Sequence, residues 1–156
     1  MYRGPVQSPE LVLDFGHEQW SGRLFLPETV GEVITMEHIQ NVLNDSRQFV
    51  PVAVTTPPFV WLVNKQHIIR VQWSFQSVPE MEKHVTWDQR ARVRLQMYPE
   101  RAFHGYLIMT HLREGQDRVQ DFLNLPGDFA TVVDHEHICI WFVNKRWILR
   151  IGHFHE

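Results

Sequence analysis

The sequence predicts a mainly β protein with two short helices, an α+β fold made by tandem duplication of one small unit. Two observations lead to this prediction. Residues 43–71 align without a gap on residues 123–151, and ten of the 29 aligned pairs are identical. Short segments rich in valine, isoleucine and aromatic residues recur between turn residues in both halves, which is typical of strands. Self-similarity of this kind indicates a repeated structural unit.

The alignment continues upstream and sets the boundaries of the units. Residues 20–26 correspond to residues 103–109, and residues 11–15 correspond to residues 93–97. Units of this size are marginally stable alone, so we expect the two to pack together as a pseudo-dimer within the chain. The chain is thus predicted to contain unit one over residues 1–75, a linker over residues 76–90 and unit two over residues 91–156.

Each unit is predicted to have the order β-β-α-β-β-β. Apolar residues at i, i+3 and i+4 predict a short amphipathic helix after the second strand. These residues are Ile39, Val42 and Leu43 in unit one and Val119, Phe122 and Leu123 in unit two. Short strands in this order fit a small five-stranded barrel.

Four repeated asparagines are interpreted as conformational residues. Asn44 and Asn124 follow the predicted helices, where an asparagine in the left-handed region can end a helix. Asn64 and Asn144 each precede a lysine between two apolar strands, where a tight hairpin needs a positive φ angle. We therefore interpret the Asn-Lys pair as a hairpin tip, with a ligand-binding pair as the alternative.

The order of elements, the glycine in the second strand, the string from Asp121 to Asn124 and the tight turn before the last strand resemble the Sm-like barrel. In that family a related Asp-x-x-Met/Leu-Asn string contacts RNA, so the resemblance implies a nucleic-acid-binding module. The repeated Leu-Asn and Val-Asn-Lys pattern is also similar to that of small uncharacterised bacterial β-barrel domains, from which no function carries over.

Composition bounds the class of partner. The net charge is −3 and no block of lysine or arginine stands out, whereas proteins that bind phosphate backbones usually show a basic stripe. No apolar run reaches the roughly 18 residues of a membrane span, and the N-terminus lacks the apolar core of a signal peptide. We therefore expect a cytoplasmic protein without membrane insertion, and we do not favour nucleic acid as a partner. The single cysteine, Cys139, excludes an intrachain disulfide.

Histidines near Cys139 are the best candidates for chemistry. His135 and His137 have a spacing that can share a zinc ion, and His153 and His155 can supply further ligands. The alternative is a solvated loop without metal, which we favour, so we expect no cofactor. Motifs for phosphate loops, zinc proteases and serine hydrolases are absent, which favours a non-catalytic protein.

Tryptophans and arginines supply the candidate interface residues. Trp61 and Trp141 occupy the same repeat position and are predicted to lie in the core. The other candidates lack an aromatic counterpart or recur as arginine at the edge of the last strand, and interfaces are enriched in tryptophan and arginine. They are Trp73, Trp87, Trp147, Arg70 and Arg150. For Trp147 the alternative is a place in the core.

The sequence therefore favours a non-catalytic protein-interaction or assembly module whose partner is another protein or a second copy of the chain. One alternative is a nucleic-acid-binding module of Sm-like type. The other is a metal-dependent enzyme that uses the histidine loop of unit two.

Overall fold

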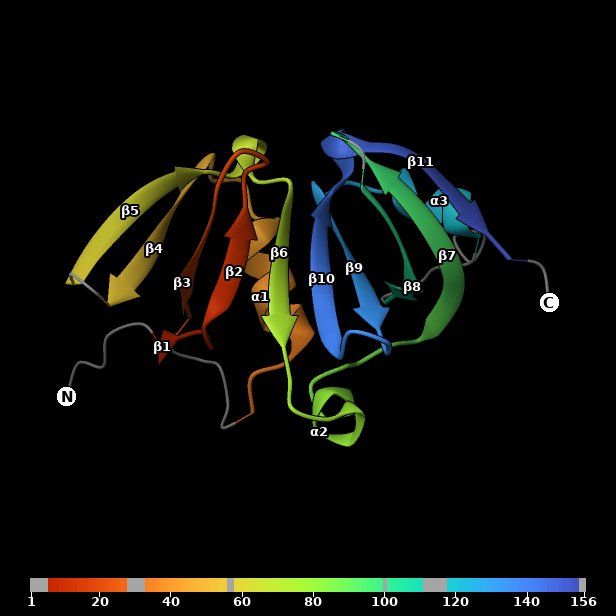
Figure 1. The fold of residues 1–156 in the computed structure, drawn as a ribbon, viewed down its shortest axis with the longest axis horizontal. Coiled ribbons are helices and arrows are strands. Elements are labelled where there is room, and N and C mark those ends of the chain that lie inside the picture. The colour runs from red at the N-terminus through yellow and green to blue at the C-terminus, as the bar shows by residue number, and fades with distance from the viewer. Residues whose placement is uncertain (1–5, 28–32, 56–57, 100, 111–117, 155–156) are drawn as a thin grey trace.

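All eleven strands that the structure describes belong to one antiparallel sheet (Figure 1). The computed structural model describes residues 6–27, 33–55, 58–99, 101–110 and 118–154. The path through the sheet begins at β11 and ends at β5, and these two strands do not pair with each other. The sheet is therefore open. Among the described strands, β5 does not pair with β6 and β10 does not pair with β11, so neither half closes into the small barrel expected from the strand order. Within the described residues, no helix combines the length and apolar character needed to span a membrane.

The first half of the chain supplies β1 (Val6–Gln7), β2 (Leu11–Asp14), β3 (Gln19–Leu26), α1 (Met36–Leu43), β4 (Phe49–Thr55), β5 (Pro58–Asn64), the 3₁₀ turn η1 (Lys65–His67) and β6 (Arg70–Ser74). The second half supplies α2 (Val78–Glu82), β7 (Gln89–Met97), β8 (Arg101–Met109), α3 (Val119–Leu123), β9 (Phe129–Asp134), β10 (Cys139–Asn144), the 3₁₀ turn η2 (Lys145–Trp147) and β11 (Ile148–His153). Three described helices replace the two that were expected, because α2 forms within the predicted linker.

The two halves have the same strand order and the same register. The order is β6, β2, β3, β4, β5 in the first half and β11, β7, β8, β9, β10 in the second. Val52 pairs with Trp61 in the first half, and Val132 pairs with Trp141 in the second. The other pairs of neighbouring strands along this order agree in the same way, so residues equated by the sequence alignment occupy equivalent places. The short β1 pairs with β3 outside this order and has no counterpart among the described strands of the second half.

A glycine lets β3 come close to β4 in the first half, and another lets β8 come close to β9 in the second. A Cβ atom on Gly22 would lie 2.5 Å from a methyl carbon of Val52, and one on Gly105 would lie 2.6 Å from a methyl carbon of Val132. Real Cβ atoms do not tolerate such distances, so each glycine is required by a close approach rather than by a turn.

The repeated Asn-Lys pair is not a hairpin tip with positive φ. Asn64 and Asn144 both have φ of −74°, and each begins a 3₁₀ turn. The side-chain oxygen of Asn64 accepts a hydrogen bond from the Gln66 N–H at 3.1 Å, and that of Asn144 accepts one from the Arg146 N–H at 3.0 Å. The expectation failed because a side-chain cap satisfies this turn without a left-handed residue.

The helix-ending asparagines also depart from expectation. Asn44 has φ of −100° and Asn124 has φ of −86°, so neither adopts the left-handed conformation. The lysine of each Asn-Lys pair closes the helix instead. Lys65 Nζ donates to the Val42 carbonyl in the last turn of α1 at 3.5 Å and to the Asp45 carbonyl just beyond the helix at 2.8 Å. Lys145 Nζ donates to the Leu123 carbonyl at the end of α3 at 3.1 Å.

The two halves share their core. One cluster of buried side chains combines most of the first half with Phe129, Ile140 and Phe142 of the second. The other cluster belongs to the second half but includes Ile69 of the first. Helix α1 contacts β3 of its own half and β9 of the other half. In Figure 1 this helix lies behind the strands at the centre of the molecule.

Candidate interaction surface

The two halves meet where β6 pairs with β10, side by side at the centre of Figure 1. Trp73 lies opposite Ile140 in this antiparallel pair. At one end of the junction, the Asn144 backbone N–H donates to the Ile69 carbonyl at 2.9 Å. The Asn144 side-chain Nδ2 donates to the Ile68 carbonyl, also at 2.9 Å. We call this contact between the halves the internal junction.

Arg70 lies at this end of the internal junction, opposite Val143. Its Nε donates to the Asp14 carboxylate at 3.3 Å, and Arg101 of the second half forms an ion pair with the same carboxylate. The Arg70 guanidinium carbon lies 4.0 Å from the ring centroid of Trp141 and 5.4 Å from that of Phe103. Burial lowers the pKa of Arg70, and the positive charge of Arg101 adds to this effect. The side chain thus joins the halves through both charge and stacking.

Further polar contacts cross the internal junction away from the paired strands. Asn44 uses its whole amide on one residue of the second half: its Oδ1 accepts from the Phe129 N–H at 2.7 Å, and its Nδ2 donates to the Phe129 carbonyl at 3.1 Å. Trp147 Nε1 donates to the Gln66 carbonyl at 3.1 Å. Asn44 at the end of α1 and Trp147 in η2 therefore help to fix the position of one half relative to the other.

At the outer end of the first half, β5 exposes a row of large apolar side chains. Trp61 is 52% exposed and Leu62 is 70% exposed, and Phe59 and Val60 are also exposed. Their equivalents on β10 lie against β6, where Ile140 and Phe142 are fully buried. The prediction that Trp61 lies in the core is therefore wrong, because β5 has a neighbouring strand on one side only.

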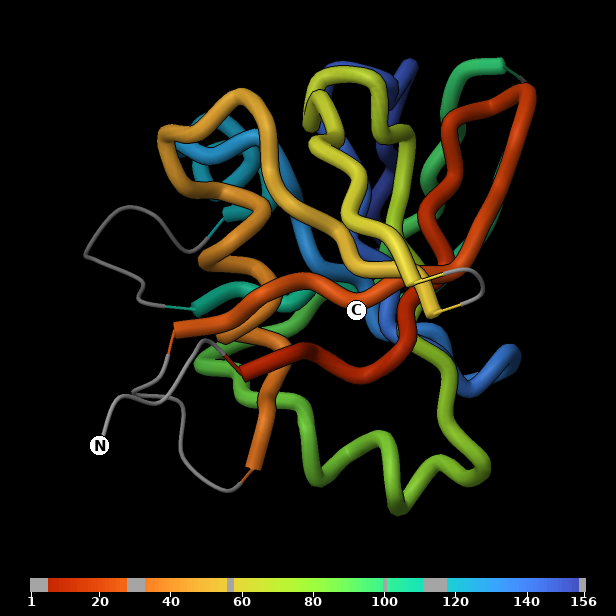
Figure 2. The backbone as a smooth tube through the Cα atoms, turned by 90° about the vertical axis from the view of Figure 1, so that its left-hand side faces the viewer, coloured from red at the N-terminus to blue at the C-terminus, as the bar shows by residue number. Residues whose placement is uncertain are grey.

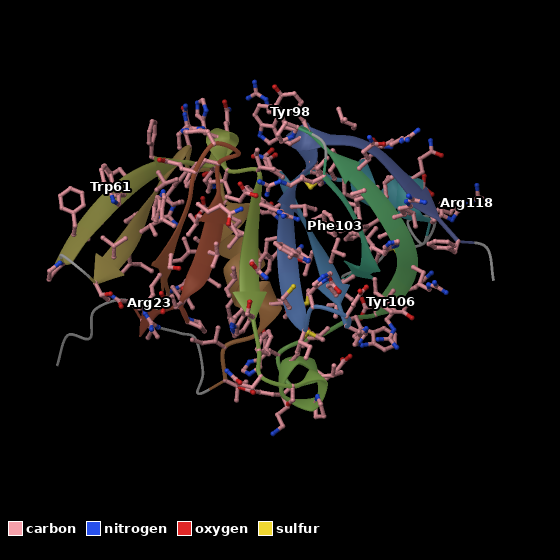
Figure 3. All side chains as sticks on the ribbon, in the orientation of Figure 1. Arg23, Trp61, Tyr98, Phe103, Tyr106 and Arg118 are labelled. Carbon is pink, nitrogen blue, oxygen red and sulfur yellow. The ribbon has the colours of Figure 1, made fainter. Side chains whose placement is uncertain are left out.

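Figure 2 views the molecule from this end, and the hairpin of β4 and β5 (yellow) lies nearest the viewer. In Figure 3, Trp61 lies at the outer end of the first half, whereas Phe103 lies toward the centre of the molecule. A groove of about 880 Å³ runs beside β5, and its lining includes Trp61, Trp20 and Glu18. At the equivalent place in the second half, Arg70 lies against Trp141 and Phe103.

The opposite end of the sheet is β11, which also exposes apolar side chains. Leu149 is 60% exposed and Phe154, just beyond the strand, is 47% exposed. Arg150 is exposed, and its Nε donates to Gln96 Oε1 at 2.6 Å. This contact repeats the bond between Arg70 and Asp14, because Gln96 occupies the place of Asp14.

The tryptophans named as interface candidates lie in three different settings. Trp73 is buried at the internal junction and packs against the tilted ring of Phe75. Trp147 is half-buried, stacks on Tyr98 and packs against the core of the second half. Trp87 is exposed and lies under the guanidinium of Arg90. Only Trp73 and Trp147 are brought to the internal junction.

The candidate metal-binding histidines engage carboxylates separately. His135 Nε2 lies 2.6 Å from Glu82 Oε1, whereas His137 Nδ1 lies 2.7 Å from Asp134 Oδ2. Hydrogen bonding to Asp134 raises the pKa of His137. His153 lies on β11, and His155 lies outside the described residues. Across the described part of the chain, no group of three or more His, Cys, Asp and Glu side chains is placed to hold a metal ion.

Two further sequence features have structural settings. Burial raises the pKa of the Cys139 thiol to about 12, so this cysteine is a poor nucleophile at neutral pH. The string from Asp121 to Asn124, on which the Sm-like resemblance rests, forms the last three residues of α3 and the C-cap residue that follows them. Asn124 Nδ2 donates back to the Gln120 carbonyl at 3.0 Å.

Comparison of the chain with protein-family models, with curated proteins and with solved structures found no match. The site is therefore defined by its own geometry. Sequence reasoning named Arg70 and Arg150 but missed Leu62, Glu18 and Asn44. The signal that was available for Asn44 was its identity with Asn124, which was interpreted as a matter of backbone conformation.

Proposed function

We propose that the protein is a non-catalytic assembly module, made by duplication of one β-β-α-β-β-β unit, that binds other polypeptides through the outer edges of its sheet. The observation that carries the proposal is the difference in burial between equivalent strands. On β10 the apolar row is covered by β6, whereas on β5 the same row is exposed. An exposed apolar edge strand promotes pairing with another chain and is blunted where it has no partner.

The duplication is supported by the repeated register and by the two matching glycines. Apart from the short β1, which pairs with β3 and has no counterpart among the described strands of the second half, each pair of neighbouring strands in the first half has a counterpart in the second with equivalent residues opposite each other. Such agreement is expected when both halves derive from one unit. A unit that already binds another unit through its fourth and fifth strands, as at the internal junction, has edges suited to assembly.

Pro58 begins β5, but the four residues that follow it lack the common devices that protect a sheet edge. Natural edges are often covered, bulged or marked by lysine. Residues 59–62 read Phe-Val-Trp-Leu, pair with β4 without a bulge and carry no charge. Contiguous apolar surface of this kind marks interaction sites on folded proteins.

The proposal is tested by changing Leu62, which is exposed and therefore not needed for the fold. Tagged wild-type chain, Leu62→Asp and Trp87→Ala are each used to capture polypeptides from an extract of the native source. We expect the wild type and Trp87→Ala to retain a polypeptide, a second copy or another protein, that Leu62→Asp loses. The purified partner should then slow amide exchange in β5 or β11. A monomer that captures nothing sensitive to Leu62→Asp contradicts the proposal.

A second candidate, nucleic-acid binding, is favoured by one surface. Arg90, Arg92 and Arg94 alternate along β7 and are all exposed. Arg90 lies over the rings of Trp87 and Tyr106, so cations and aromatic faces are interleaved there. We expect this surface, if it binds single-stranded RNA, to do so with an affinity that falls as salt rises. The absence of binding at low salt eliminates this candidate.

A further inference from the structure

The strand pairing at the internal junction can be compared with the two strands that lie at the ends of the sheet. It joins the fourth strand of one unit, β10, to the fifth strand of the other, β6. The other fourth strand is β5 of unit one, and the other fifth strand is β11 of unit two. These two strands lie at opposite ends of the sheet (Figure 1). One chain cannot bring its own β5 to its own β11 without dismantling the sheet.

We propose that β5 of one chain pairs antiparallel with β11 of a second copy, in the register of the internal junction. This inference rests on the proposed function and names its partner. Because Trp141 lies opposite Gln72 at the junction, Trp61 is expected opposite Gly152. By the same rule Val60 faces His153. Phe59 then lies opposite Phe154, and two exposed aromatic rings cover each other.

Arg150 takes the part of Arg70 in this contact. It is already oriented by Gln96, as Arg70 is oriented by Asp14. In the second copy it meets the groove beside β5, whose walls include Trp61 and Trp20. These rings replace those of Trp141 and Phe103 at the internal junction. The contact therefore reproduces the packing of one guanidinium against two aromatic rings.

The charges of the contact are complementary. At the internal junction the carboxylate of Asp14 lies between two cations, Arg70 and Arg101. In the contact between copies Gln96 is neutral, and the alignment and strand pairing put Glu18 in the place of Arg101. Arg150 of one chain therefore meets Glu18 of the other, and an ion pair forms across the interface. At the internal junction the acid, Asp14, belongs to the unit that supplies the fifth strand. In the contact between copies the acid, Glu18, belongs to the unit that supplies the fourth strand.

Two asparagines supply the remaining polar contacts. Asn64 stands where Asn144 stands, so its Nδ2 is expected to donate to the carbonyl of Ile148 in the second copy, as Asn144 donates to Ile68. Asn124 is expected to release the Gln120 carbonyl and bond the backbone of Phe49, as Asn44 bonds Phe129. One contact does not transfer, because Pro51 replaces the Thr131 that hydrogen-bonds Gln40.

A contact between two different edges leaves one edge open on each new copy. Assembly therefore continues head to tail, into a ring if the rotation between copies closes and into a filament if it does not. Both products contain the same interface between β5 and β11.

A disulfide trap tests the register in the purified full chain. Val60→Cys and His153→Cys are made separately, mixed under mild oxidation and examined without reductant. Opposed Cα atoms in an antiparallel pair lie about 4.5–5.5 Å apart, within the span of a disulfide. We expect a two-chain product, on the order of tenfold more than from Val60→Cys mixed with Leu149→Cys, which is four residues out of register. The buried thiol of Cys139 does not compete.

The outcomes separate this inference from the proposed function. Equal yields from the two mixtures, or no two-chain product, overturn pairing with a second copy. If Leu62→Asp nevertheless abolishes capture of a different protein, the assembly module stands and only the identity of its partner is wrong. If Leu62→Asp changes no binding at all, both proposals fail together.

Charge reversal gives an independent test. Arg150→Glu and Glu18→Arg should each weaken self-association, because each creates a like-charge pair across the interface. The double variant restores opposite charges and should recover at least part of the lost association, measured by sedimentation. Additive losses in the double variant contradict the contact between Arg150 and Glu18.

Discussion

Lys65 and Lys145 each donate to a carbonyl in the last turn of a helix, Val42 in α1 and Leu123 in α3, which lie 23 and 22 residues earlier in the chain. The ammonium group of Lys65 is almost completely buried, with 3% of the side chain exposed, and it also pairs with the Asp45 carboxylate at 2.8 Å. Lys145 is half-buried and donates to the carbonyls of Leu123 and Leu125. A lysine thus donates to carbonyls at the end of a helix in both halves, but the lysine of the first half is more deeply buried and is also paired with a carboxylate.

We predict that Lys65→Met lowers the free energy of unfolding by roughly 2–4 kcal/mol, because the carbonyls of Val42 and Asp45 lose their buried donor and the Asp45 carboxylate keeps only Arg47 as a partner. Lys145→Met, the matched change in the second half, should cost roughly 1–2 kcal/mol, because only carbonyls lose a partner. Urea denaturation of both variants measures the difference. A larger cost for Lys145→Met contradicts this account of the two caps.

Asp45 makes stability depend on acid pH. Burial raises its pKa, but hydrogen bonds from Arg47 and Lys65 outweigh burial and lower the pKa from 3.8 to about 2. A carboxyl whose pKa is lower in the folded state stabilises the protein above its unfolded pKa, and this contribution disappears as pH falls. We expect Asp45→Asn to remove part of the stability loss between about pH 4 and pH 2. Identical acid profiles for wild type and variant would show that the carboxylate is not paired in solution.

Adjacent strands in each half are held close by a glycine, but the two sites differ in what crowds them. At Gly22 the nearest atom is a methyl carbon of Val52 at 2.5 Å, and the next is the Ala53 carbonyl oxygen at 3.1 Å. At Gly105 both the Val132 methyl carbon, at 2.6 Å, and the Val133 carbonyl oxygen, at 2.7 Å, are too close for a side chain. A clash with the Val52 side chain can be relieved by a smaller residue at that position, whereas a clash with the Val133 backbone carbonyl remains whatever the side chain is.

We therefore predict that Gly22→Ala costs roughly 1–3 kcal/mol and that Val52→Ala relieves much of this cost. Gly105→Ala should cost at least as much, and Val132→Ala should relieve little of it. Double-mutant cycles from denaturant unfolding give the two coupling energies. No coupling between positions 22 and 52 would show that the strands adjust in another way.

Much of this organisation was predictable from repeated residues, and the rest was not for physical reasons. The periodicity of Ile39, Val42 and Leu43 predicts α1, and the alignment of Gly22 with Gly105 predicts a common strand. The conformation of Asn44 was not predictable, because its amide is used on Phe129, 85 residues further along the chain. Sequence patterns of turns describe local bonds only.

The exposed site was hidden for a related reason. The run Val60-Trp61-Leu62 has the continuous apolar character of a buried strand. That pattern does not say which strand covers it, and within this chain none of the described strands does. The tryptophans repeated in both halves were assigned to the core, yet Arg70 and Trp141, which are both repeated residues, contact each other across the internal junction.

At the level of the complete chain, the open sheet has two unlike ends and a contact in its middle that would join them. The most direct test of this account is the molar mass of the purified protein by light scattering. We predict a mass that is a multiple of 18.6 kDa for the wild type and 18.6 kDa for Leu62→Asp with an unchanged circular dichroism spectrum. A folded wild-type chain that stays at 18.6 kDa at every concentration contradicts the pairing of β5 with β11.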